Sequence, residues 1–149
     1  MNNGNNKEPT GDVGSFNLLT VNIGTQIFGV DVFKIKEIIP NKGVNSLPFQ
    51  KEHILGVVNV RGESTPVINL PYIFKKDINN EHGYFVIVES AGSSYALLVN
   101  EVLQIHNSVN NGKGKVGSSL SQFILASVFI GDSIVNVLNI DHLVVFDKS

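Results

Sequence analysis

The chain contains no cysteine, and this absence removes several kinds of chemistry. Without a thiol there is no disulfide framework, no thiolate zinc site and no cysteine nucleophile. No apolar run approaches the roughly 20 residues that a membrane-spanning helix needs. The polar N-terminus, MNNGNNKEPTGDVGS, lacks the hydrophobic segment of a secretion signal. A cytoplasmic location fits these absences.

Charge is scarce and nearly balanced. The formal net charge is −2 and the pI is about 6.0. The sequence shows no basic face, which argues against binding of DNA or RNA through phosphates. With 149 residues and 42% hydrophobic content, the chain can bury a real core, either as one compact domain or as two small lobes sharing an interface.

An internal repeat covers most of the chain. Residues 56–74 match residues 126–144, which lie 70 positions further on, and earlier segments match 67 positions apart. The aligned pairs include Val60 with Ile130, Val67 with Val137, Asn69 with Asn139, Val21 with Val88, Phe28 with Tyr95 and Ile35 with Val102. Two similar offsets indicate one β-rich unit used twice. The two units differ most clearly where Arg61 stands opposite Gly131.

Alternating apolar residues and turn signals predict short strands and no long amphipathic helix. The predicted strands are 16–23, 27–32, 56–60, 65–70, 84–89, 95–100, 102–105, 124–130 and 133–138. This pattern favours small closed or nearly closed barrels, which protect sheet edges. Residues 1–15 are predicted to be a flexible polar tail, 75–83 the crossover between two lobes, and 107–119 a mobile loop.

Four residues carry local signals. Asp31 and Asp141 can each cap a short helical turn, and Pro71 suits the first turn of a helix that ends near Phe74. Pro66 predicts that its strand lies at a sheet edge or begins beside a bulge, because proline cannot donate to a ladder.

No catalytic, metal or cofactor site emerges from the motifs. The histidines show no metal-ligand spacing and have no cysteine partners; they are His53, His82, His106 and His142. The glycine-rich segment 112–119 lacks the Gly-Lys-Ser/Thr ending of a phosphate-binding loop. No nucleophile and base are suggested by order or strand context. The sequence therefore predicts a protein that is not an enzyme and binds no cofactor or metal.

Arg61 is the only arginine in the chain, and it lies in a predicted turn between two apolar strands. One interpretation is a solvated turn residue, or a local salt bridge that fixes the hairpin. The other is a planar donor fork that a rigid scaffold presents to a partner. The residues alone favour neither interpretation, and Gly62 is compatible with both.

The motifs resemble those of the CheW-like chemotaxis coupling domain over about residues 16–146. The matching segments are FGVDVFKIKEII (28–39), LP (47–48), ILGVVNVRGESTPVINL (54–70), YALLVNEV (95–102) and VNVLNIDHLV (135–144). The resemblance implies an all-β fold of two SH3-like five-stranded β-barrel lobes packed side by side, with short helical turns, over residues 16–149. Asn69 and Asn100 depart from the family, which often has aspartate at both positions.

The resemblance also implies a function. The family forms scaffolds that couple chemoreceptors to the histidine kinase CheA, whose regulatory domain has the same fold. Its receptor-binding surface falls on Ile35, Glu37, Gly56, Arg61, Gly62, Val99 and Val102. We expect Glu37 to orient Arg61 at a groove between the lobes, with Ile35, Val99 and Val102 as an apolar floor for a receptor helix. The expected partners are the CheA regulatory domain and the cytoplasmic tip of a methyl-accepting chemoreceptor, which would bring the chain to membrane receptor arrays without inserting it in the bilayer.

Two other functions stay open at this stage. The chain could be a CheW-like regulatory module of a larger signalling protein, such as a kinase C-terminal domain or a receiver-domain fusion. The start at Met1 and the polar tail favour the free adaptor. A β-barrel hydrolase is the weaker alternative, because it requires a catalytic constellation that the sequence does not show.

Overall fold

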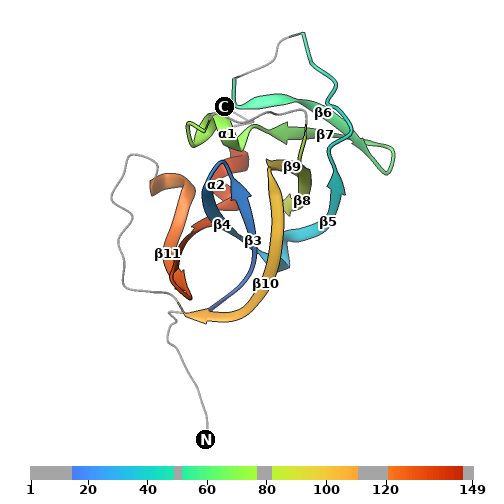
Figure 1. The fold of residues 1–149 in the computed structure, drawn as a ribbon. Helices are drawn as coiled ribbons and strands as arrows, with labels where there is room; N and C mark the ends of the chain where they lie inside the picture. The colour runs from blue at the N-terminus through green and yellow to red at the C-terminus, as the bar shows by residue number, and fades with distance from the viewer. Residues whose placement is uncertain (1–14, 49–51, 77–81, 111–120, 146–149) are drawn as a thin grey trace, which may run out of the picture.

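The computed structural model describes residues 15–48, 52–76, 82–110 and 121–145 (Figure 1). Within these ranges the strands are β3 (Ser15–Ile23), β4 (Gln26–Asp31), β5 (Ile35–Pro40), β6 (Ile54–Val60), β7 (Glu63–Ile68), β8 (Tyr84–Ser90), β9 (Ser93–Val99), β10 (Glu101–Asn110), β11 (Ile124–Ile130) and β12 (Ser133–Leu138). The helical turns are η1 (Val32–Lys34), α1 (Leu70–Ile73), η2 (Ser121–Phe123) and α2 (Ile140–Val145). The predicted all-β class is confirmed.

Two predicted segments differ at their boundaries. Ser15 already belongs to β3, and the rest of the predicted tail lies outside the described residues. Strand β10 continues to Asn110, so residues 107–110 are strand and not the start of a loop. Pairing with β3 extends β10 through this polar stretch, since Val109 and Asn110 lie opposite Phe16 and Ser15. Residues 111–119 of the predicted loop lie outside the described part.

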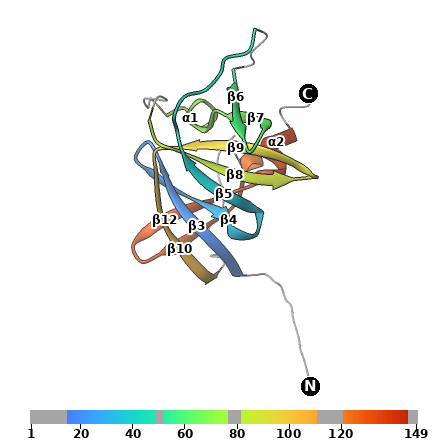
Figure 2. The same ribbon diagram turned by 90° about the vertical axis from the view of Figure 1, so that its right-hand side faces the viewer.

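The strands form two five-stranded sheets, one for each lobe, and the lobes lie side by side (Figures 1 and 2). The terminal lobe has the strand order β10-β3-β4-β12-β11. The central lobe, which runs from β5 to β9, has the order β5-β8-β9-β7-β6. Strand for strand, the two orders correspond through the sequence repeat, so the repeat is a structural one.

The predicted crossover at residues 75–83 is wrong. Residues 75–83 lie between α1 and β8 in the chain, and the strands on either side, β7 and β8, belong to the same sheet. The chain passes between the lobes at η1, after β4, and again at Asn100, between β9 and β10. Each repeat therefore contributes two strands to one lobe and three strands to the other. The repeat identifies equivalent strands but does not reveal this exchange between the lobes.

Three apolar clusters hold the fold together. One fills the central lobe around Val67, Phe85 and Leu98, and a second fills the terminal lobe around Leu18 and Val137. The third and largest cluster lies between the lobes and includes residues of both sheets, α1 and α2. Strands β8 and β9 are buried on both faces because alternate side chains enter different clusters.

Asparagine side chains fix several chain reversals. The Asn69 Oδ1 atom accepts a hydrogen bond from the Tyr72 N–H at the start of α1, and Asn139 does the same for His142 in α2. Asn139 therefore takes the capping role that we predicted for Asp141. The Asn100 carboxamide accepts from the Gly24 N–H. Asn69 and Asn100, where the resemblance implies aspartate, thus both accept a hydrogen bond from the backbone.

Asp31 accepts from the Phe33 N–H, which confirms its predicted role as a cap. Of the two alternatives predicted for Pro66, the edge strand is wrong, because β7 lies inside its sheet, between β9 and β6.

Candidate functional site

Arg61 and Glu37 form a two-pronged ion pair at the end of the central lobe. The Arg61 Nε atom donates to Glu37 Oε2 at 2.9 Å, and Nη2 donates to Oε1 at 3.3 Å. The Glu37 side chain is only 24% exposed, whereas that of Arg61 is 80% exposed. Hydrogen bonding to Glu37 raises the pKa of Arg61 above its usual value, so the guanidinium stays charged. The carboxylate is thus the anchor, and the guanidinium is the part that is presented to solvent.

The ion pair joins the two outer strands of the central sheet. Glu37 lies on β5 at one edge, and Arg61 follows β6 at the other edge. Between them lies a cavity of about 210 Å³, which has Lys36, Val60, Thr65, Ile87 and Ser94 in its wall. All five strands of the lobe contribute to this wall. The pair therefore closes the mouth of the barrel and points toward solvent from a rigid rim.

The backbone at Arg61 adopts a conformation that side chains disfavour. Its φ is 51°, in the left-handed region, and the next residue, Gly62, has a φ of 87°. Positive φ at both central positions is what a tight hairpin turn needs. The Asn59 Oδ1 atom accepts from the Gly62 N–H and holds the turn in place. The equivalent position in the other lobe is Gly131, with a φ of 62°, where the same conformation carries no steric cost.

The remaining predicted site residues fall into two groups. Gly62 is exposed beside Arg61, and Ile35 and Val102 are partly buried against the interlobe cluster. Gly56 and Val99 are buried. The structure therefore places a polar pair at the mouth of the central lobe and an apolar pair beside the interlobe core, and not one continuous site with Val99 as an exposed floor.

Gly56 has a packing role that explains its identity. Its φ is 151°, and a β-carbon at this position would clash with the carbonyl oxygen of Asn45. The Asn45 and Val57 backbones exchange two hydrogen bonds next to it. The close approach of these two segments therefore requires glycine.

A family model, the CheW-like domain, matches residues 17–147. The chain belongs to the CheW-like family.

Two relatives illustrate how far this likeness extends. The curated chemotaxis protein CheW of Treponema pallidum (strain Nichols) is 27% identical over 96 residues, which make up 60% of this chain and 56% of that protein. The crystal structure of the scaffolding protein TtCheW from Thermoanaerobacter tengcongensis superposes with a TM-score of 0.75 at 21% identity, covering 87% of this chain and 92% of that one. This second likeness establishes the two-lobe fold.

Within this CheW-like chain, the two barrel mouths have different chemistry. The mouth of the terminal lobe is a cavity of about 280 Å³. Three residues of this cavity are the repeat equivalents of charged residues in the central mouth. Leu103, Gln104 and Ser133 stand where the central mouth has Lys36, Glu37 and Glu63. The mouth of the terminal lobe therefore lacks the three charged side chains that the central mouth has at these positions. Aligning the two repeats position by position would have revealed this difference in charge from the sequence.

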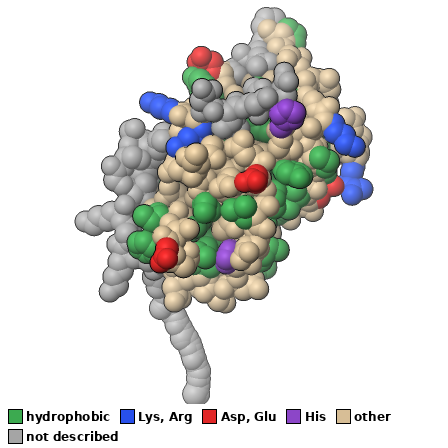
Figure 3. All heavy atoms as spheres, in the orientation of Figure 1, with side chains coloured by type: hydrophobic (Ala, Val, Ile, Leu, Met, Phe, Trp, Pro, Cys, Tyr) green, Lys and Arg blue, Asp and Glu red, His purple; other side chains and the backbone are tan. Residues whose placement is uncertain are grey.

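Sequence reasoning also missed an exposed apolar strip on the β11–β12 hairpin. Phe129 and Ile134 lie directly opposite each other in the ladder, and they are 67% and 59% exposed. Leu125, on the same face of β11, is 55% exposed. Their counterparts in the central lobe are Leu55, which is half-buried, and the polar Asn59 and Ser64. Figure 3 shows apolar side chains lying open on the surface of the molecule.

The described residues contain no group of three or more His, Asp or Glu side chains placed to hold a metal ion. In the same part of the chain, no helix is long and apolar enough to cross a membrane.

Proposed function

We propose that this chain is a non-catalytic scaffold that couples bacterial chemoreceptors to the histidine kinase CheA. Membership of the CheW-like family places it in chemotaxis signalling. The observation that carries the receptor half of the proposal is the guanidinium of Arg61, which is held by Glu37 and yet is mostly exposed. A guanidinium group that is already held in place loses less conformational entropy on binding than a free lysine side chain does. On this proposal the protein works in the cytoplasm, at the receptor arrays.

The receptor contact combines the two parts of the site. Glu37, Arg61 and Gly62 supply a polar anchor at the barrel mouth, and Ile35 and Val102 supply half-buried apolar surface. A receptor helix that lies on this surface uses a helix-in-groove mode. Gly56 and Val99 are buried, so on this proposal they do not contact the receptor themselves.

The kinase contact lies elsewhere, on the ends of the lobes. The strip of Leu125, Phe129 and Ile134, termed the hairpin strip, is the best described candidate, because monomeric proteins rarely leave large apolar side chains clustered on one hairpin. A contact of this kind resists moderate salt, since apolar burial is not screened.

The test of the receptor half is a titration of Arg61→Ala against a receptor cytoplasmic fragment and against the CheA regulatory domain. We expect receptor binding to weaken by about 1–3 kcal/mol, as for a strong interface residue. We expect the loss of stability to be smaller than the loss of receptor binding, because the guanidinium of Arg61 is mostly exposed to solvent. Kinase binding should change little.

Equal loss for both partners, together with a large fall in melting temperature, would make Arg61 a structural residue and remove the basis of the proposal. Turnover of ATP, phosphopeptides or esters that is abolished by a point substitution would contradict the non-catalytic assignment.

A further inference from the structure

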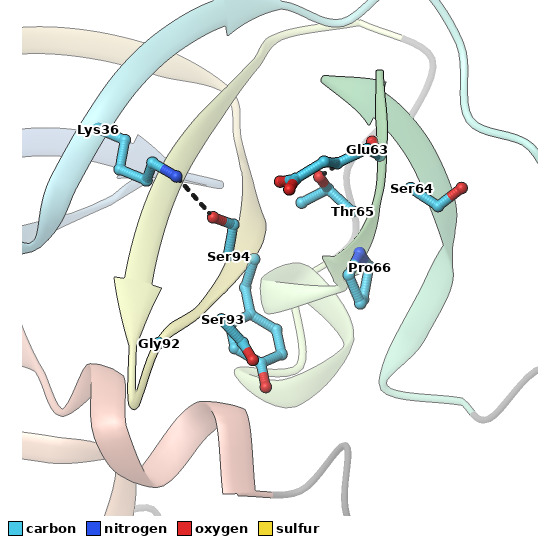
Figure 4. Close-up of a pocket in the computed structure, with 9 residues that line it drawn as sticks. Lys36, Glu63, Ser64, Thr65, Pro66, Gly92, Ser93 and Ser94 are labelled. Carbon is cyan, nitrogen blue, oxygen red and sulfur yellow. Dashed lines mark hydrogen bonds between the residues drawn. The ribbon is translucent and has the colours of Figure 1, made fainter. Parts of the chain in front are cut away.

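A polar cavity of about 620 Å³ opens between β7 and β9 of the central lobe (Figure 4). Glu63, Thr65 and Pro66 line one side, and Ser93, Ser94 and Tyr95 line the other. Lys36 reaches it from β5 and donates a hydrogen bond from Nζ to Ser94 Oγ at 3.0 Å. Neither the function proposed above nor the predicted receptor site accounts for this cavity.

The cavity exists because two neighbouring strands stop pairing. Parallel pairing of β7 with β9 is confined to Val67 with Ala96 and Ile68 with Leu97. In the terminal lobe the equivalent strands pair from Val135 with Ile27 onward, which is two residues nearer their N-terminal ends. Asn136 of that ladder corresponds to Pro66, which has no N–H to donate.

Residues 63–66 and 93–95 thus face each other as two strand edges with no partner between them. We call this gap the β7–β9 slot. Unpaired edges inside a sheet are unusual, since backbone N–H and C=O groups otherwise find partners. Water can satisfy them, but so can the backbone of a further strand.

The slot passes through the wall of the barrel. Thr65 and Ser94 also line the charged mouth inside the lobe, whereas Tyr95 belongs to the interlobe cluster on the other face. Tyr95 is buried, and its hydroxyl makes no hydrogen bond within the part of the chain that the structure describes. A buried tyrosine hydroxyl normally has a partner. A ligand in the slot can supply one.

We propose that the β7–β9 slot binds an extended peptide segment of a partner protein, which pairs with both strand edges and completes the sheet. Four residues, 63–66, line the β7 side, so the inserted segment is about four residues long. Its side chains alternate between the polar interior, near Lys36 and Ser94, and the outer face, near Pro66 and Tyr95. This mode differs from the helix-in-groove contact proposed for the receptor, and neither depends on the other.

The probe is a capped peptide of alternating threonine and valine over four residues, with one lysine at each end for solubility. It is titrated into the isotope-labelled full chain, and backbone amide shifts are followed by NMR. We expect changes at the amides of residues 63–65 and 93–95 and none at the equivalent positions Ile27 and Val135. The matched control peptide carries N-methyl groups on both valines, which removes two backbone donors and should weaken binding by about tenfold or more.

Two variants test the slot itself. Pro66→Asn restores the N–H that Asn136 provides in the other lobe, and Ser94→Trp fills the cavity. Each should lose peptide binding while keeping a cooperative melting transition, and one suffices if the other fails to fold. The proposal is overturned if the peptide does not bind, if the N-methylated peptide binds equally well, or if the folded variants bind as the wild type does.

Discussion

At the residue scale, Arg61 combines backbone strain with an exposed charge. A non-glycine residue at positive φ costs about 1–2 kcal/mol, and Arg61 is such a residue in a turn where the other lobe has Gly131. Arg61→Ala and Arg61→Gly both lose the pair with Glu37, but only the glycine variant also removes the strain. We therefore expect Arg61→Gly to be more stable than Arg61→Ala by about 1 kcal/mol, as measured by urea unfolding.

The matched control for that comparison is Ala91→Gly in the β8–β9 hairpin. Ala91 has a φ of 53° and precedes Gly92, as Arg61 precedes Gly62. This substitution should raise stability by a similar amount and leave receptor binding unchanged. If Arg61→Gly proves less stable than Arg61→Ala, relief of backbone strain does not govern the stability of this turn.

The sequence predicted the pair of Arg61 with Glu37 correctly from the motifs that hold them, but it expected the pair at a groove between the lobes. In the structure the pair joins the two edge strands at the mouth of the central lobe. It did not predict that Val99 is fully buried. A valine in a strand can face either side, and which side is covered depends on how the lobes pack. For the same reason, the close contact of Gly56 with Asn45 could not be read from either segment alone.

At the element scale, the hairpin strip can be converted into its polar counterpart. The double variant Phe129→Asn/Ile134→Ser takes the residues found at Asn59 and Ser64 of the other lobe. Both side chains are mostly exposed, so stability should change by about 1 kcal/mol or less. Binding of the CheA regulatory domain should weaken by about 2 kcal/mol or more, as expected when interface anchors are removed. Calorimetric titration at two salt concentrations measures this.

Phe33→Ser is the control, because Phe33 is 81% exposed but lies on η1. Unchanged affinity of the hairpin variant, or an equal loss for Phe33→Ser, would place the kinase contact elsewhere.

The hairpins themselves were predictable from the sequence because their turns carry local chemistry. Gly-Asp and Gly-Thr pairs between apolar runs predict tight turns, and the structure has turns at both places. Pro66 was harder to interpret. A proline in a strand predicts a missing hydrogen bond, but the sequence does not say whether the strand lies at an edge or, as here, beside a gap inside the sheet.

At the scale of the whole molecule, a polar contact ties α2 to the central lobe. The Asp141 carboxylate accepts from Lys34 Nζ at 2.7 Å and from the Ser90 hydroxyl at 2.6 Å. These two hydrogen bonds hold the pKa of Asp141 below its usual value. A lowered folded-state pKa means that the contribution to stability is present above the unfolded pKa of about 3.9 and is lost as the pH falls through the folded value.

Asp141→Asn should therefore lower stability near neutral pH, by about 1 kcal/mol or less because Asp141 is well exposed. The difference from the wild type should shrink at about pH 3 and below. Denaturant midpoints of both proteins across this range provide the measurement. A difference that stays constant with pH would show that the charge on Asp141 does not contribute.

The exchange of strands between lobes was the part of the fold that the sequence could not supply. The repeat gives equivalent strands, but a unit that closes on itself and a unit that exchanges with its neighbour have the same apolar pattern. The deciding factor is the pairing of distant strands, such as β4 with β12 and β7 with β9.

This exchange makes a prediction about fragments. Residues 1–79 contain β3 and β4 without the rest of the terminal lobe, and they lack β8 and β9, which separate β5 from β7 in the central sheet. Residues 80–149 lack β3 and β4 of the terminal sheet and β5, β6 and β7 of the central sheet. Neither fragment can therefore complete a sheet or bury the interlobe cluster. Each should be largely unfolded alone by circular dichroism and NMR, and an equimolar mixture should recover the native spectrum. A fragment that melts cooperatively on its own would show that one repeat can close into a lobe without strands from the other.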